Sequence, residues 1–560
     1  MMKPRIQMLQ RFWLVLAAGC ASAPEVPEVR FANAPAPDRV DDRRDVPVPP
    51  AERAFYQSLY EYNGTVQRRL TRAMELPRHE RALGVNALDE VPDSTWFTNR
   101  IGARELTLDE LRTGPSQVGS PERHRPWTVH TTKPGAAELG LRITDARGIE
   151  FLLKFDLPTS PEQETGAQVI AGKLLWACGF HVTDDYVVLF DPTDLVLASD
   201  AVSKDVLGNQ HPLGRAELDE LLRKTGTAPD GRLRAMASRW LAGKALGGPP
   251  DEGVREDDPN DRIPHQLRRD RRGAYAMFAW LDHVDAAESN AADMWVKDGG
   301  RHYVEHYLLD FGKALGVMNT TGLNPRHGFE YVVDFAAMLH SLVTLGVEKR
   351  PWEGQVAPPL RGVGMFDAAS FDPGAWKSDW PAYVSFLTAD RFDNFWGAKI
   401  LIRFTPEQVR AVVETGRLSD PRAVDYLTAT LVTRQRATAR YWFDRVNPLD
   451  RFAVAPEGSG AVLCFDDLAL VYGLGANPAA TQYRITAYDR DGRALGGAVV
   501  FHPGAAGHAC TGPLALTAGG DGYTILRVET RRPGQDLATL VHVARDPATG
   551  APRVIGIWRL

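Results

Sequence analysis

Two short motifs, whose facing ends are 20 positions apart, carry the side chains of this sequence that are best suited to phosphate chemistry. The first runs from His283 through Asp285 to Asn290, and the second is Asp310-Phe311-Gly312. In this order they supply a carboxylate that can orient a hydroxyl group, an amide oxygen for a metal ion, and a carboxylate for a metal ion that bridges nucleotide phosphates. The two motifs therefore predict a site for phosphoryl transfer.

The segment upstream has the pattern of a β-hairpin followed by a strand that carries a lysine. Gly135 and Gly140 lie in the predicted turn, Pro134 to Gly140, and Lys154 lies in the third strand. A glycine-containing turn can cover phosphates, and a strand lysine can pair with them. The predicted strands are Trp127 to Lys133, Leu141 to Asp145 and Ile149 to Phe155.

A helix is predicted after this lysine, from Glu164 to Gly179. Its apolar residues recur at helical spacing at Ala167, Ile170, Ala171, Leu174, Leu175 and Cys178.

The order of these features resembles the protein-kinase-like superfamily, whose catalytic loop reads His-x-Asp-x-x-x-x-Asn and precedes a metal-binding Asp-Phe-Gly. The spacing from Asp285 to Asn290 matches that loop. The resemblance covers about residues 125–445 and is closer to atypical bacterial members, including the HipA and CotH kinases, than to eukaryotic protein kinases. It implies an α+β fold in which a β-rich N-terminal lobe precedes a helical C-terminal lobe.

The resemblance also implies cofactors and roles. ATP and Mg²⁺, or Mn²⁺, would be the cofactors, with Lys154 on the α- and β-phosphates and Asn290 and Asp310 as metal ligands. Asp285 would be the catalytic base, and His283 would brace the catalytic loop. The resemblance also implies that a side chain of the 164–179 helix holds Lys154, either Glu164 at the helix start or Gln168 one turn further on. If Gln168 does so, a hydrogen bond replaces an ion pair and places the lysine less firmly. The acceptor could be a protein, a glycan or a small molecule.

Two departures from the kinase pattern bear on activity. Val284 and Ala287 stand where protein kinases commonly carry Arg and Lys. The missing lysine removes a cation from the transferring phosphoryl group, where one preorganised donor contributes about 2.7–4 kcal/mol. Either another cation substitutes, or the protein is a catalytically weak pseudokinase that binds a partner. The missing arginine argues against control by activation-loop phosphorylation.

A metal hydrolase is a less favoured alternative. His283, His302 and His306 lie near Asp285 in the sequence, but no HExxH pattern would place two of them on one helix face. His302 and His306 instead fall in a predicted strand.

The N-terminus has the pattern of a secretory signal. Basic residues precede the short apolar run Phe12 to Ala18, which is followed by Gly19-Cys20. This ending resembles a bacterial lipobox, which implies lipid on Cys20 and attachment to a membrane of the cell envelope. The next residues, Ala21 and Ser22, favour the outer membrane. Residues 21–50 are rich in Pro and Ala and predict a disordered tether.

The composition favours a globular chain without a nucleic-acid surface. The sequence has 560 residues, of which 24% are charged, and a net charge of −6. About 510 residues beyond the tether correspond to about three domains. We expect a mainly helical extension at 51–124, an N-terminal lobe at 125–200, a helical C-terminal lobe at 201–446 and a β-sandwich at 447–560.

Several local features add further expectations. Trp96 and Phe97 are expected to pin the extension to the core. In the C-terminal segment, Cys464 and Cys510 could form a disulfide in an oxidising compartment.

Helices are predicted at 217–224, 232–243, 263–283, 327–346, 392–402, 406–416 and 421–444. Four arginines near the start of the 263–283 helix are expected on a solvated face: Arg268, Arg269, Arg271 and Arg272. Alternatively, they could contact a partner or a phosphate, or pair with the acidic stretch 257–261.

Overall fold

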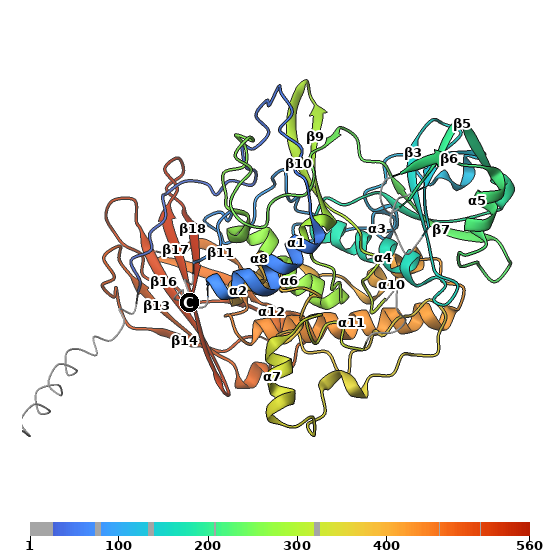
Figure 1. The fold of residues 1–560 in the computed structure, drawn as a ribbon. Coiled ribbons are helices and arrows are strands. Elements are labelled where there is room, and N and C mark those ends of the chain that lie inside the picture. Colours follow the sequence, from blue (N-terminus) through green and yellow to red (C-terminus); the bar gives the residue numbers. More distant parts are fainter. Residues whose placement is uncertain are drawn as a thin grey trace, which may run out of the picture.

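The chain has a mixed α+β fold in which β-sheets lie at both ends of a helical body (Figure 1). The computed structural model describes residues 26–72, 80–132, 139–205, 209–317, 325–458, 460–504 and 506–560. Within these residues the strands form sheets of seven, three, three and five strands. No helix of the described chain combines the length and the apolar character that a membrane crossing requires.

The seven-stranded sheet carries the predicted hairpin and the lysine strand. Its strand order is β4-β7-β3-β2-β1-β5-β6. Apolar residues alternate along β1 to β3, so one face of the sheet buries Trp127, Ile143 and Leu153 against helix α5. The strands are β1 Trp127–Thr132, β2 Gly140–Thr144, β3 Glu150–Phe155, β4 Asp185–Phe190, β5 Leu195–Lys204, β6 Gln210–Pro212 and β7 Leu233–Arg239, and α5 is Arg215–Leu222.

The helix predicted over 232–243 is wrong, because this segment forms strand β7 between β3 and β4. Both faces of β7 are covered, so its pattern of burial does not alternate. Arg234 is buried on one face, where it donates hydrogen bonds to Thr165 Oγ1 and to the carbonyl of Gly416. The sheet therefore continues past residue 200, where we expected the helical region to begin.

Helix α4, Gln163–Cys178, confirms the helix predicted over 164–179. It packs on the face of the sheet opposite to α5, where Val169 contacts Val187 of β4 and Met236 of β7. Nearly all of its residues are buried, since the helical body covers its other side.

The helical body is built around α6, Arg269–Leu281, and α9, Arg391–Leu401. These two helices approach closely because each has a glycine at the contact. A Cβ atom on Gly397 would lie 2.3 Å from the carbonyl oxygen of Gly273. The other helices are α7 Phe335–Val343, α8 Val384–Thr388, α10 Pro406–Glu414, α11 Pro421–Phe443 and α12 Leu468–Val471. The helices predicted at 392–402, 406–416 and 421–444 are thus confirmed, while those at 263–283 and 327–346 are shorter than predicted.

The arginine run of α6 is buried, which contradicts the expected solvated face. Arg269 pairs with Asp393 at 2.7 Å and with Asp89 at 3.1 Å, and both of these carboxylates come from distant segments. Arg271 likewise pairs with Asp251 at 3.2 Å. Such a charge is buried only where carboxylates surround it. The arginines therefore tie the N-terminal segment and α9 to α6.

The N-terminal region docks along the molecule, so the disordered tether predicted for residues 21–50 is wrong for its described part, 26–50. Val26 is buried and Phe31 half-buried among residues of the C-terminal β-region. Further along, the buried Asp42 accepts hydrogen bonds from the backbone N–H and the hydroxyl of Thr95. Prolines prevent this segment from forming regular structure, but its apolar side chains still pack against other parts of the chain.

The extension at 51–124 is not mainly helical. Its short helices are α1 Gln57–Tyr62, a π-helical turn Asn63–Gln67, α2 Arg68–Thr71 and α3 Leu108–Thr113. Trp96 and Phe97 are buried in the hydrophobic core with residues of α4, α6 and α9, as expected. Short 3₁₀ turns occur at Pro121–Arg123, Pro192–Asp194, His265–Leu267, Glu288–Asn290, Pro351–Gly354 and Pro478–Ala480.

The C-terminal region consists of two antiparallel sheets around a common core, as predicted. One sheet has the order β11-β12-β15 and the other β14-β13-β16-β17-β18. Cys464 of β12 and Cys510 of β15 form a disulfide, which confirms that these cysteines pair. The strands are β11 Leu449–Glu457, β12 Gly460–Asp467, β13 Gln482–Tyr488, β14 Val499–Phe501, β15 His508–Cys510, β16 Thr524–Arg532, β17 Gln535–Arg545 and β18 Pro552–Arg559.

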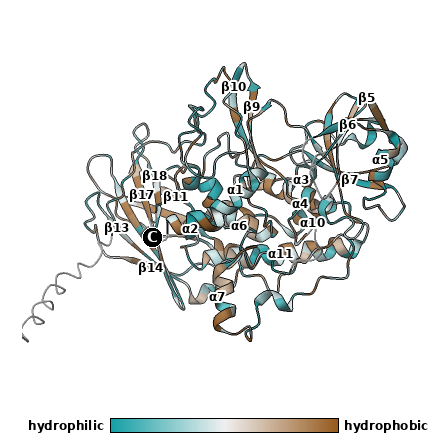
Figure 2. Ribbon diagram, in the orientation of Figure 1, coloured by the Kyte–Doolittle hydropathy of each residue, from teal (hydrophilic) through white to brown (hydrophobic). Residues whose placement is uncertain are grey.

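Helix α7 differs from the other helices in its surface. Its apolar side chains, among them Met338, Leu339 and Leu342, are exposed, and Figure 2 shows this hydrophobic stretch at the edge of the molecule. None of its residues is buried. It lies outside the packed helical body.

Candidate functional site

A β-hairpin joins the two sequence motifs and brings their ends together. Strand β9, Ala291–Asp298, begins directly after Asn290, and β10, Arg301–Leu308, ends just before Asp310. Gly299 and Gly300 both have positive φ and form the tight turn between the strands. Because the strands are antiparallel, Ala291 pairs with Leu308. The 19 residues between Asn290 and Asp310 thus bring the second motif back beside the end of the first.

Asn290 braces the loop that carries Asp285. Its side-chain amide donates a hydrogen bond to the backbone carbonyl of Asp285 at 2.8 Å. The backbone carbonyl of Asn290 accepts a hydrogen bond from the N–H of Leu309. The amide nitrogen is thereby assigned as the donor, so the side-chain oxygen is the atom of Asn290 that can bind a cation.

His283 is a buried structural residue. Its ring packs between Phe278 of α6 and Phe311, with ring centroids 4.6 Å and 5.5 Å away. Burial lowers the pKa of His283 to about 4. The imidazole is therefore neutral near pH 7, and it links the two motifs by packing rather than by carrying a proton.

Asp310 lies where the seven-stranded sheet meets the helical body. Lys154 of β3 donates a hydrogen bond from Nζ to Asp310 Oδ1 at 2.6 Å, although 156 residues separate them in the sequence. The backbone of Asp310 has a φ of +59°, which non-glycine residues adopt at a cost and which often marks functional sites. In this conformation its carboxylate, 39% exposed, faces the lysine.

The residues proposed to cover or hold a nucleotide are only partly brought together. Gly140 is the first residue of β2 and lies opposite Lys154 in the register of the sheet. Gly135 falls in the segment 133–138, outside the described residues. The amide of Gln168 donates to Asp185 Oδ2 at 2.7 Å, so this side chain holds a β4 carboxylate.

Helix α4 instead contacts the Asp-Phe-Gly motif directly. A Cβ atom on Gly312 would lie 2.7 Å from Cγ of Glu164, and one on Gly172 would lie 3.2 Å from the ring of Phe311. Glycine at both positions allows this approach. Of the two helix candidates, Glu164 is therefore the one that lies against the motif.

Lys313, which the sequence motifs did not include, lies beside Asp285. Lys313 Nζ is 2.9 Å from Asp285 Oδ2 and 4.0 Å from Asp379 Oδ2. Although burial disfavours its charge, Asp285 raises the pKa of Lys313 above its ordinary value, so the side chain is charged at neutral pH. Its place directly after Gly312 was the signal that could have identified it.

Asp379 supports this loop from the helical body. Its backbone N–H donates to the carbonyl of Val284 at 2.8 Å, and its carboxylate is 3.3 Å from His327 Nε2. Burial raises the pKa of Asp379 to about 7, with a contribution from the charge of Asp285. The sequence pattern did not single out Asp379, because it lies 94 residues after Asp285.

The histidines of the hydrolase alternative do not converge. His302 stacks on Trp295, and His306 bonds to Asp293 at 2.7 Å within the β9–β10 hairpin. In the parts of the chain that the structure describes, the cluster of potential metal ligands is elsewhere, in the C-terminal β-region. This arrangement gives no support to a histidine-bound hydrolytic metal.

No family model matches this chain, and no curated protein matches it. A crystal structure of a Helicobacter pylori proinflammatory kinase, CtkA, is similar with a TM-score of 0.29 and 11% sequence identity, covering 56% of this chain and 97% of that one. A similarity of this size does not establish a shared fold.

Proposed function

We propose that this protein is an ATP- and Mg²⁺-dependent phosphotransferase of the atypical kinase-like kind, which transfers a phosphoryl group to a hydroxyl acceptor. The seven-stranded sheet with α4 would be its N-terminal lobe, and the body around α6, α9 and α11 its C-terminal lobe. The observation that carries the proposal is the 2.6 Å contact of Lys154 with Asp310, beside a loop in which Asn290 braces Asp285. Lys154 and Asp310 come from separate segments and meet between the two regions.

The carboxylate of Asp310 and the side-chain oxygen of Asn290 suit Mg²⁺, which prefers oxygen ligands and commonly takes one or two carboxylates together with phosphates. When bound, the ion would neutralise charge on the β- and γ-phosphates; Mn²⁺ would serve similarly. Lys154, already held at this position by Asp310, is placed to pair with the α- and β-phosphates.

Asp285 would orient the acceptor hydroxyl and accept its proton during transfer. Lys313 would supply the positive charge that Ala287 lacks, since its ammonium group lies 2.9 Å from the same carboxylate. This contact favours catalysis over the pseudokinase alternative. A protein that binds MgATP without turning it over would support that alternative instead.

The direct test is nucleotide binding. We expect millimolar MgATP to raise the melting temperature of the wild-type protein, by an amount equivalent to about 2.7 kcal/mol at 100 times the dissociation constant. Asp310→Ala should lose this shift, because it removes the principal carboxylate for the metal. The shift is measured by differential scanning fluorimetry, for each variant relative to its own ligand-free melting temperature.

The matched control is Asp298→Ala, which removes an exposed carboxylate from the same hairpin and should retain the shift. A wild-type protein without any shift in MgATP or MnATP would contradict the proposed nucleotide site.

We further propose that the chain is anchored in the bacterial cell envelope, at the outer membrane, through lipid on Cys20. Cys20 lies outside the described residues, and the support is its lipobox-like context. Val26 is already docked on the C-terminal β-region. The five residues from 21 to 25 would span at most about 18 Å. The folded protein would therefore be held close to the membrane rather than at the end of a long tether.

Cys20→Ser is expected to move the protein from the membrane fraction to the soluble fraction, because it removes the only acceptor for lipid in this motif. The measurement is immunoblotting of fractionated cells, with Cys178→Ser as a control thiol substitution at a buried site. Undiminished membrane association of Cys20→Ser would refute the anchor.

A further inference from the structure

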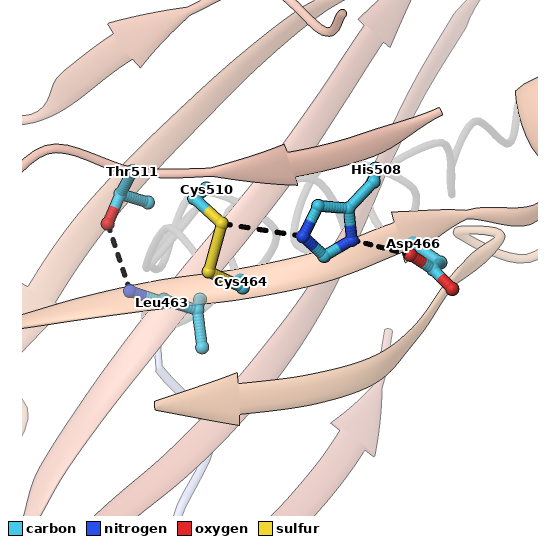
Figure 3. The surroundings of a disulfide bond; sticks show 6 residues. All are labelled: Leu463, Cys464, Asp466, His508, Cys510 and Thr511. Carbon is cyan, nitrogen blue, oxygen red and sulfur yellow. Dashed lines mark hydrogen bonds and ion pairs between the residues drawn. A yellow bond between two sulfur atoms is a disulfide. The ribbon is translucent and has the colours of Figure 1, made fainter. Parts of the chain in front are cut away.

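Four side chains with metal-binding atoms lie on one face of the β12–β15 pair (Figure 3). Cys464 lies opposite Cys510, and Asp466 lies opposite His508. Residues two apart on a strand share a face, so the two cross-strand pairs form a square. The phosphotransferase proposal makes no use of this cluster.

The distances between these side chains are close to those expected around a bound metal ion. His508 Nδ1 is 2.8 Å from Asp466 Oδ1, while Nε2 is 3.5 Å from Cys510 Sγ. The ligand atoms of Cys464, His508 and Cys510 all lie within 4.8 Å of one another. A tetrahedral Zn²⁺ ion would hold a thiolate sulfur and an imidazole nitrogen about 3.5 Å apart, given its usual bond lengths.

We propose that reduction of the Cys464–Cys510 disulfide converts this face into a Zn²⁺ site. Cys464, Cys510 and Nε2 of His508 would be the ligands, with the fourth position open to water or another ligand. Asp466 would accept a hydrogen bond from Nδ1–H and thereby fix the histidine with Nε2 toward the metal. In the oxidised protein the sulfurs are bonded to each other, so the site does not exist.

The conversion is a balanced exchange. A dithiol donates two electrons and two protons to the disulfide and is itself oxidised to a disulfide, leaving two cysteine thiols. Zn²⁺ then displaces the two thiol protons as it binds the thiolates. His508 and Cys510 are exposed, so both the reductant and the metal can reach the site.

The two oxidation states of one protein provide the primary test. Full-length protein carrying Cys20→Ser is reduced with a phosphine, which supplies no thiol ligand, and freed of reductant without oxygen. We expect one Zn²⁺ per chain in the reduced protein and none in the oxidised protein, measured by competition with a chromophoric chelator. Co²⁺ as a probe should show thiolate-to-metal charge-transfer absorption only after reduction.

Variants then identify the ligands. In the reduced protein, His508→Ala should weaken Zn²⁺ binding by more than tenfold, and Asp466→Asn should weaken it by about 10–100-fold, the range for a residue that orients a metal ligand. His502→Ala alters a histidine of the same β-region that is bonded to a backbone carbonyl, and it should have no effect.

Melting curves of the oxidised variants confirm that each is folded. Absence of Zn²⁺ uptake by the reduced protein would overturn the proposal. Equal uptake by the oxidised protein, or unchanged affinity in His508→Ala, would overturn it as well.

Discussion

Asp285→Asn is expected to lower phosphoryl transfer or ATP hydrolysis by about 10²–10⁴-fold while leaving the MgATP-induced melting shift in place. The substitution preserves the shape of the side chain but removes the group that accepts the hydroxyl proton. The loop itself should persist, because Asn290 holds the backbone carbonyl of residue 285 rather than its side chain. Initial rates of ADP formation and melting shifts are measured on the same preparations.

The matched control for this experiment is Asp298→Asn, which makes the same chemical change at an exposed position of the hairpin. It should have wild-type rates. If Asp285→Asn is as active as wild type, the carboxylate has no catalytic part, and the match to a kinase catalytic loop is an accident of spacing.

Lys313→Ala is expected to lower turnover by about 10²–10³-fold, which corresponds to the loss of one preorganised cation at the transferring phosphoryl group. Lys313 lies 2.9 Å from Asp285 and is charged at neutral pH, so it can supply the positive charge that Ala287 lacks. The loss should appear mainly in the turnover number, with a smaller effect on the MgATP melting shift.

Two further variants separate charge from packing. Lys313→Arg keeps a cation and should retain part of the activity. The double variant Lys313→Ala with Ala287→Lys should recover part of what Lys313→Ala loses, because it returns a cation to the loop two residues after Asp285. Lys297→Ala removes an exposed lysine from β9 and serves as the control. Wild-type turnover in Lys313→Ala would show that this contact is structural only.

These experiments also decide between the two functional alternatives. A protein that shows the MgATP shift but no turnover with any hydroxyl acceptor would be a nucleotide-binding pseudokinase. In such a protein, Asp285→Asn and Lys313→Ala would change neither rate nor binding.

The sequence by itself determined the elements whose pattern is local. The three segments predicted as strands between 127 and 155 correspond to β1 to β3, and a helical repeat of apolar residues identified α4, because such a repeat reflects burial along the helix. The strand predicted around His302 and His306 is β10, although its pairing with β9 was not predicted. The short, turn-rich segments after residue 447 identified the C-terminal β-sheets.

The sequence-based predictions were wrong where a segment is buried against parts of the chain that are distant in the sequence. Strand β7 is buried on both faces and includes Arg234, so its sequence does not alternate and resembles a helix. The arginines of α6 look solvated in the sequence because their carboxylate partners, Asp89 and Asp393, lie 180 and 124 residues from Arg269. Residues 26–50 look like a tether because the surfaces on which they dock belong to other segments.

Only the tertiary structure decided which side chains meet at the candidate site. In it, Lys154 bonds to Asp310 and Gln168 bonds to Asp185. Glu164 packs against Gly312, and Lys313 pairs with Asp285. Local periodicity reports whether a side chain is buried, but the identity of its partner depends on how distant elements pack. A replacement cation can therefore come from any segment that reaches the site, and its sequence position is not fixed by the motif that it completes.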